Sequence, residues 1–365
     1  MVSRRPRARS AALLVAVAGF GALSAAAVAG CGNSATANVI TWKRPPAPLA
    51  AADAASVNTA LAANQRAIAG YDAAGPLLSG AAQQADGWFL GQELSHAGML
   101  RSLVVRLGGT AHEPDANYQL GHPETTHQLI ALLGSLERDQ INATAVAIGR
   151  VHEGVARALL ATILADDAKH LIALGSIEST PRPAGAFPTP YAPSIDAADV
   201  GRIEDLLRGE SVATTAFALS LRSGHLSQPA RALAGYLLAQ ERVHVHVLQR
   251  LLAGAGVRQA STHSTGLPID EILRSTAVRL PRSALGSQRG WIDLFQWIEW
   301  RLEGLLYYSV IPRLTGRDAL LASSIMASEA EHSVLVAELR RHGDTRAAVP
   351  IAIVVGRRWP DQPRW

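Results

Sequence analysis

The stretch Ala327-Ser328-Glu329-Ala330-Glu331-His332 decides which fold this sequence specifies. Glu329 and His332 are three residues apart, so on a helix both side chains point the same way, one turn apart. Apolar residues continue that row in steps of three and four: Leu321, Ile325, Val336 and Leu339. The pair is therefore expected to face the core, where a carboxylate beside an imidazole is costly unless each has a partner. A metal ion would partner both, although a single isolated pair also fits a hydrogen-bonded core histidine.

The same pairing, an acid followed three residues later by a histidine, occurs four times: Glu93/His96, Asp167/His170, Glu241/His244 and Glu329/His332. Helical periodicity predicts four helices between about residues 54 and 174 and four more between about 200 and 342, and each pair falls in an even-numbered helix. A proline-rich segment from Thr180 to Pro193 separates the two sets. Four matches in corresponding places favour a repeated site over chance.

Hairpin geometry predicts which carboxylates of the odd-numbered helices join these pairs. In antiparallel neighbours, residues at one height are equidistant from the turn. The midpoint between a carboxylate and the acid of the pair on the next helix must then fall at the break between the two helices. This rule selects one carboxylate in each of three helices: Glu137, Glu210 and Glu303. In the first hairpin it puts Asn64 opposite Glu93, and an amide cannot neutralise or bridge cations as a carboxylate does.

Residues 200 to 342 then hold one glutamate from each of two helices and a Glu-x-x-His from each of the other two. This set resembles that of the ferritin-like superfamily of di-iron and di-manganese four-helix bundles. The first half, with Leu61-Ala62-Ala63-Asn64 and Leu136-Glu137-Arg138-Asp139, is also similar to ferritin-like domains of actinomycetes. The resemblance covers most of the mature chain. It implies an all-α fold of two tandem four-helix bundles, each with a long crossover between its second and third helices.

The resemblance also implies a role for each ligand of the second bundle: bridging for Glu241 and Glu329, terminal for Glu210 and Glu303, and one metal each for His244 and His332. The first bundle is expected to hold a damaged or single-metal site with weaker ligands: Glu93, His96, Glu137, Asp167 and His170. Oxygen-rich ligation with one imidazole per ion suits iron or manganese better than zinc or copper.

The implied reaction is oxidation of ferrous iron by oxygen or peroxide, or peroxide disproportionation if manganese is bound. Tyr307, one turn beyond Glu303, is a candidate catalytic residue that could hydrogen-bond a ligand or be oxidised, or it could simply belong to the core. Glu299, one turn before Glu303, is expected to be an iron entry residue or a solvated acid. The alternative function is that of a non-catalytic, partner-binding protein that keeps a structural or vestigial metal site.

The first thirty residues indicate export, because four arginines precede an apolar run from Ala11 to Ala29. Val28-Ala29-Gly30-Cys31 resembles the bacterial lipobox, in which the cysteine becomes the lipidated N-terminus; an ordinary cleaved signal peptide is the alternative. We therefore expect Cys31 to anchor the protein to the outer face of the cytoplasmic membrane, by either Sec or twin-arginine export.

The expected organisation is a signal peptide (1–30), a tether (31–52), the first bundle (53–178), a linker (179–198), the second bundle (199–342) and a C-terminal tail (343–365). The chain has 34 basic and 30 acidic residues, and the arginines of the signal account for the excess. A nearly neutral mature protein gives no reason to expect nucleic acid binding. The expected partners are metal ions, oxygen or peroxide, and the membrane through the N-terminal lipid.

Overall fold

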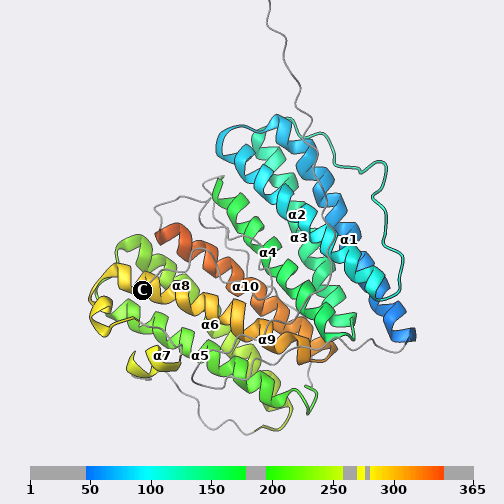
Figure 1. Cartoon of the computed structure of the whole chain (residues 1–365). Coiled ribbons are helices and arrows are strands. Elements are labelled where there is room, and N and C mark those ends of the chain that lie inside the picture. The colour runs from blue at the N-terminus through cyan, green and yellow to red at the C-terminus, as the bar shows by residue number, and fades with distance from the viewer. Residues whose placement is uncertain (1–46, 178–194, 258–268, 276–279, 341–365) are drawn as a thin grey trace, which may run out of the picture. The chain divides into compact units, whose positions relative to one another are not determined.

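The computed structural model describes residues 47–177, 195–257, 269–275 and 280–340 (Figure 1). These ranges consist of helices with turns and loops between them and contain no strand, so the expected all-α class is confirmed for the described part of the chain. All of the described residues belong to one compact unit. The predicted signal peptide, Cys31, most of the tether, most of the linker and the tail lie outside the described residues.

The N-terminal helix group consists of four long helices: α1 (Ala47–Ala74), α2 (Gly80–Arg106), α3 (Thr126–Arg150) and α4 (Gly154–Ile177). α1 packs against α2 and α3, and α4 packs against α3 and α2. A short 3-10 turn, η1 (Gly75–Leu77), connects the first two helices. The connection from α2 to α3 is long, as expected for a crossover.

The first helix begins at Ala47, six residues before the predicted start of the first bundle at residue 53. The sequence interpretation included Pro48 in the tether, as part of the run Pro45-Pro46-Ala47-Pro48. At the second position of a helix, however, the missing N–H removes no intrahelical hydrogen bond, and proline is well tolerated. The tether boundary at residue 52 was therefore wrong.

The C-terminal helix group begins with α5 (Val200–Arg222) and α6 (Gln228–Gly254), followed by the short α7 (Ile269–Ser275) and η2 (Arg282–Gly286). The third long helix starts as α8 (Gln288–Arg301), continues through a π-helical segment, η3 (Leu302–Tyr307), and ends in α9 (Tyr308–Val310) and η4 (Ile311–Arg313). The last helix is α10 (Gly316–Arg340). α5 packs against α6 and α8, and α10 packs against α8 and α6.

Local sequence explains where several of these helices begin and end. Thr125 and Gln128 form a reciprocal capping box at the start of α3, and the side chain of Ser287 caps α8. Gly224 and Gly256 follow α5 and α6 with φ values of 74° and 73°. Glycine adopts this left-handed conformation without strain, so each residue ends its helix.

α4 and α10 lie side by side and join the two helix groups (Figure 1). The start of α4 also lies close to η4, because a Cβ on Gly154 would lie 2.5 Å from the carbonyl oxygen of Pro312. The same oxygen accepts a 2.9 Å hydrogen bond from the guanidinium group of Arg157. Further along, Ile172 of α4 packs with Val334 of α10. The two helices in contact are therefore those that carry the second acid and histidine pair of each half.

Candidate metal centre

The C-terminal helix group brings six acidic and imidazole side chains together, which we call the C-terminal cluster. They form two overlapping sets, in each of which one ligand atom per residue lies within 4.8 Å of the others: Glu210, Glu241, His244 and Glu329, and Glu241, Glu299, Glu329 and His332. Every member is buried. Glu241 and Glu329 belong to both sets, as expected of carboxylates that bridge a pair of ions.

Each imidazole of the C-terminal cluster turns Nδ1 toward carboxylates from other helices. Nδ1 of His244, on α6, lies 2.8 Å from Oε1 of Glu329 on α10 and 3.3 Å from Oε2 of Glu210 on α5. Nδ1 of His332, on α10, lies 3.3 Å from Oε1 of Glu241 and 3.5 Å from Oε2 of Glu299 on α8. The two rings are nearly parallel, with centroids 5.9 Å apart. All four long helical segments of the group thus contribute at least one of the converging atoms.

Many of these buried atoms have no hydrogen-bond partner. Both carboxylate oxygens of Glu241, Glu299 and Glu329 make no hydrogen bond, and neither does Nδ1 of His332. Ionised groups buried in this way are strongly unfavourable unless a cation or a proton compensates them. The charge of the four carboxylates would be balanced by two divalent cations. The donor set therefore fits a pair of hard cations.

The pKa values of the cluster reflect the same excess of negative charge. Burial raises the pKa of Glu241 and of Glu299, and the neighbouring charge of Glu329 raises both further. Burial also opposes ionisation of Glu329, but its contacts with His244 and His332 outweigh burial and lower its pKa. The pKa of His244 rises to about 9 in spite of burial, because Glu210 and Glu329 favour its charged form. Without ions, the carboxylates of the cluster compete for the two imidazoles that face them.

Glu299 supplies the carboxylate of the third helix in the second of these sets. The side chain of Glu303, which the hairpin rule selected, lies outside the part that the structure describes. Glu299 is 0% exposed, so the expectation of a solvated acid was wrong, whereas the role of an iron entry residue stays a prediction. The midpoint between Glu299 and Glu329 is Leu314, which follows η4 in the same break. The rule is thus satisfied by either glutamate, since a break of several residues does not distinguish neighbouring helical turns.

One feature of the sequence distinguishes the two glutamates. Glu137 precedes Asp167 by thirty residues in the first half, and Glu299 precedes Glu329 by the same thirty residues in the second. Glu303 does not have this spacing. Comparison of the two halves with each other would therefore have identified Glu299.

Tyr307 ends the π-helical segment, is fully buried and donates its hydroxyl hydrogen to Oε1 of Glu210. A π-helical turn contains an extra residue relative to an α-helical one. The eight residues from Glu299 to Tyr307 therefore complete about two turns, which puts both side chains on the same face. The contact with a candidate ligand, one of the roles expected for Tyr307, is present.

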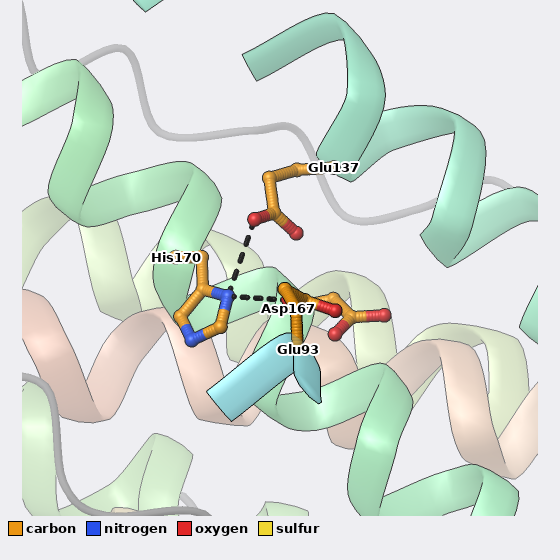
Figure 2. Close-up of side chains that lie close together, drawn as sticks. All are labelled: Glu93, Glu137, Asp167 and His170. Atoms are coloured by element: carbon orange, nitrogen blue, oxygen red, sulfur yellow. Dashed lines mark hydrogen bonds and ion pairs between the residues drawn. The ribbon is translucent and has the colours of Figure 1, made fainter. Parts of the chain in front are cut away.

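The N-terminal helix group holds a single set of four converging ligands among its described residues: Glu93, Glu137, Asp167 and His170. Figure 2 shows His170 turned toward both glutamates, with Nδ1 3.0 Å from Oε1 of Glu93 and 3.2 Å from Oε1 of Glu137. Burial opposes the charged form of His170, but Glu137 and Glu93 raise its pKa well above the usual value. The fifth predicted ligand, His96, lies beside this set without belonging to it. We call these five residues the N-terminal cluster.

Asn64 lies where the hairpin rule put it, since its amide donates a 2.5 Å hydrogen bond to Oε2 of Glu93. Tyr71, which the sequence interpretation did not select, donates its hydroxyl hydrogen to Oε1 of Glu137. This contact mirrors the one between Tyr307 and Glu210 in the other cluster. Tyr71 follows Asn64 by seven residues, or two helical turns, and that spacing was the available signal.

Two more residues near the N-terminal cluster were not predicted. Oε1 of Gln92 lies 2.6 Å from Nε2 of His170, and Oδ2 of Asp166 lies 3.3 Å from Nε2 of His96. Both residues immediately precede an acid of the acid and histidine pairs. On a helix such a neighbour lies about 100° away, so periodicity alone does not direct attention to it.

Comparison with known proteins found no matching family model, no matching curated protein and no matching solved structure. Among the described helices, none combines the length and the hydropathy that a membrane span requires. The geometry of the two clusters is therefore the basis for a functional proposal.

Proposed function

We propose that this chain is an exported lipoprotein of ferritin-like type, built as two tandem four-helix bundles, with a dinuclear iron or manganese site in the C-terminal bundle. The observation that carries the proposal is the pair of overlapping ligand sets that share Glu241 and Glu329. Each set adds one further glutamate and one histidine, from different helices. This is the ligand composition of ferritin-like carboxylate sites, with Glu299 as the fourth glutamate.

The choice of iron or manganese follows from the chemistry of the donors. Each ion would meet carboxylate oxygens and one imidazole nitrogen, a composition that suits these metals better than zinc or copper. The absence of thiols from the site removes the ligands that usually hold zinc in structural sites. Glu241 and Glu329 would bridge, Glu210 and Glu299 would each bind one ion, and His244 and His332 would complete the two coordination spheres.

We propose that the site oxidises ferrous iron with oxygen or peroxide, or removes peroxide. A bound pair of redox metals supplies two one-electron changes at one place. The chain itself excludes water, because every ligand is buried, and holds the ligands on four helical segments. The Tyr307 hydroxyl orients Glu210 through its hydrogen bond and keeps a proton beside the site. The N-terminal cluster, with Asn64 in place of a carboxylate, would hold one ion.

The deciding experiment counts metal ions in the mature chain and in the double variant Glu241→Ala with Glu329→Ala. We expect the variant to lose the two ions of the C-terminal bundle and to keep its helical circular dichroism, because the N-terminal helix group is unchanged. An equal metal content in the two proteins would refute the site. Oxygen or peroxide consumption by the ferrous or manganous protein then separates an enzyme from a non-catalytic, partner-binding protein with a structural metal.

A further inference from the structure

Asp86 is a buried carboxylate that belongs to neither cluster. It lies in α2 and is 3% exposed, and its Oδ1 has no hydrogen-bond partner. Burial, together with the charge of Asp72, raises the pKa of Asp86 to about 7. A carboxylate in such a place is stabilised by a proton or by a cation. Its Oδ1 is therefore available as a ligand atom.

Asp86 lies close to solvent at the hairpin turn between α1 and α2. Its Oδ2 faces the η1 turn, where a Cβ on Gly75 would lie only 2.6 Å away. Glycine at this position thus leaves the space that the carboxylate occupies. Asp72, in the last turn of α1, is exposed and is near enough to raise the pKa of Asp86. One aspartate is therefore at the surface, and the other is just beneath it.

On its other side, Asp86 is directed along α2 toward the N-terminal cluster. Glu93 follows Asp86 by seven residues, so both lie on one face of α2, roughly 10 Å apart along the helix. Phe89 lies between them, stacks on His170 with ring centroids 4.3 Å apart, and meets the ring of Tyr71 edge-on at 6.2 Å. Every residue of the N-terminal cluster is at most 1% exposed, so an ion needs a route from solvent. Along α2 that route has Asp86 as a step and Phe89 as its barrier.

The C-terminal half has no counterpart of the two aspartates. The residue seven places before the ligand acid is Asp86 in α2 and Ala234 in α6. Ala234 is fully buried in the apolar core. Asp72 likewise corresponds to an alanine when α1 and α5 are aligned on Asn64 and Glu210. A structural requirement of the repeated fold would act on both halves, so the two aspartates serve something specific to the N-terminal half.

We infer that Asp72 and Asp86 form a transit site through which a divalent cation, manganese(II) or iron(II), enters the N-terminal cluster. Asp72 attracts the hydrated ion, Asp86 binds it beneath the surface, and movement of the Phe89 ring lets it pass to Glu93. Carboxylate oxygens are the ligands that such hard cations prefer, and a path lined by one sign of charge raises association rates. The inference rests on the proposed function, since it requires a cluster that binds metal.

The test measures how fast the N-terminal cluster takes up an ion. It uses the mature chain carrying Glu241→Ala and Glu329→Ala, above pH 7, where Asp86, with its pKa of about 7, is mostly ionised. The protein is mixed with manganese(II), free metal is removed on a chelating resin at successive times, and bound metal is counted by plasma mass spectrometry. Asp86→Asn should slow loading about tenfold. It should still reach one ion per chain, because Asp86 is not one of the converging ligands.

Two further variants separate a local route from a general effect of charge. Asp72→Asn should slow loading at low ionic strength and much less at high ionic strength, because its charge is exposed. Asp139→Asn removes an exposed carboxylate of α3 that pairs with Arg66, and it should leave the loading rate unchanged. Gly75→Ala, which pushes on the Asp86 carboxylate without removing a charge, should slow loading as Asp86→Asn does.

Two results would overturn the inference: loading of Asp86→Asn at the unaltered rate, or equal slowing by Asp139→Asn. In both cases the cluster still binds its ion, so the proposed function survives. Failure of the proposed function looks different, because the background protein would then bind no ion at saturation, which would refute the cluster together with its route. Circular dichroism of each variant shows that a change in rate does not come from unfolding.

Discussion

Replacing Glu299 with glutamine should affect the metal-loaded and metal-free proteins in opposite directions. Glutamine keeps the size of the side chain and removes its charge. In the loaded protein, the set of Glu241, Glu299, Glu329 and His332 loses an anionic ligand. In the metal-free protein, a buried carboxylate with two unpaired oxygens disappears, and its pKa shows that burial and the charge of Glu329 already disfavour ionisation.

The size of each effect follows from these contacts. Removing even an outer partner of a metal ligand weakens metal binding about 10- to 100-fold. Loss of the ligand itself should therefore lower the affinity for the ion held by the set that contains Glu299 roughly 100-fold. That factor corresponds to about 2.7 kcal/mol. A buried charge without a partner costs more than a buried neutral amide, so Glu299→Gln should stabilise the metal-free chain by about 2 kcal/mol. For a protein of this size the gain raises Tm by roughly 5 °C.

The assay measures bound metal by plasma mass spectrometry after dialysis against a metal buffer, and Tm by calorimetry in a chelator. Two variants serve as matched controls. Glu331→Gln removes another buried carboxyl group whose pKa is raised by burial, but Glu331 belongs to neither ligand set. It should stabilise the metal-free chain without changing the ion number. Glu303→Gln tests the ligand that the hairpin rule favoured.

Two results would refute this reasoning. If Glu303→Gln lowers the ion number and Glu299→Gln does not, the third-helix ligand has been assigned to the wrong residue. If Glu299→Gln lowers the Tm of the metal-free protein, the unpaired carboxylate is not a destabilising charge, and the electrostatic argument for cations loses its basis.

Three further predictions concern Gly154 at the start of α4, the buried acid Asp86, and Tyr307. Gly154→Ala should destabilise the chain by about 2 kcal/mol in a denaturant titration, because its Cβ would lie 2.5 Å from a backbone oxygen. Gly98→Ala is the control: its Cβ would meet open space, so it should stabilise the chain by up to about 1 kcal/mol. Burial and Asp72 raise the pKa of Asp86 to about 7, so the chain loses stability as pH rises from about 4 to 7. The stability of Asp86→Asn should therefore match that of the unaltered chain near pH 4 and exceed it by about 2 kcal/mol above pH 7, where solvent screening reduces the full effect of the shift. Equal unfolding curves at pH 8 would contradict this. Tyr307→Phe removes the donor to Glu210 and should weaken metal binding by the C-terminal cluster about tenfold, which a competition titration against a chelator measures.

The helices could be predicted from the sequence because apolar periodicity, turn glycines and prolines act locally. The capping box at Thr125 and the glycines Gly224 and Gly256 lie at helix ends that the local sequence marks. The start of α1 was missed because Pro48 has opposite effects at a helix end and in a helix interior. The contact of α4 with α10 was not predicted, since it depends on apolar surface that no local pattern reports.

Most of the candidate site followed from two rules, the three-residue spacing of acid and histidine and the symmetry of hairpins about their turns. The rules bring Glu210, Glu241 and Glu329 together as the structure does. They selected Glu303, whose side chain lies outside the described residues, and did not select Glu299 one turn away, because a break of several residues does not distinguish neighbouring helical turns. Partners such as Asp166 depend on which way an imidazole edge faces, and a periodicity argument does not contain that information.

The two clusters differ in how far the protein alone compensates their buried carboxylates. In the N-terminal cluster, Asn64 donates to Glu93, and both Tyr71 and Gln140 donate to Glu137. In the C-terminal cluster, the bridging candidates Glu241 and Glu329 accept no hydrogen bond. Stability of the C-terminal group should therefore depend more strongly on cations, since ions that bind only the folded state stabilise it by mass action. Because α10 carries Glu329 and also packs on α4, the N-terminal group can hold one side of the C-terminal cluster in position before the ions bind.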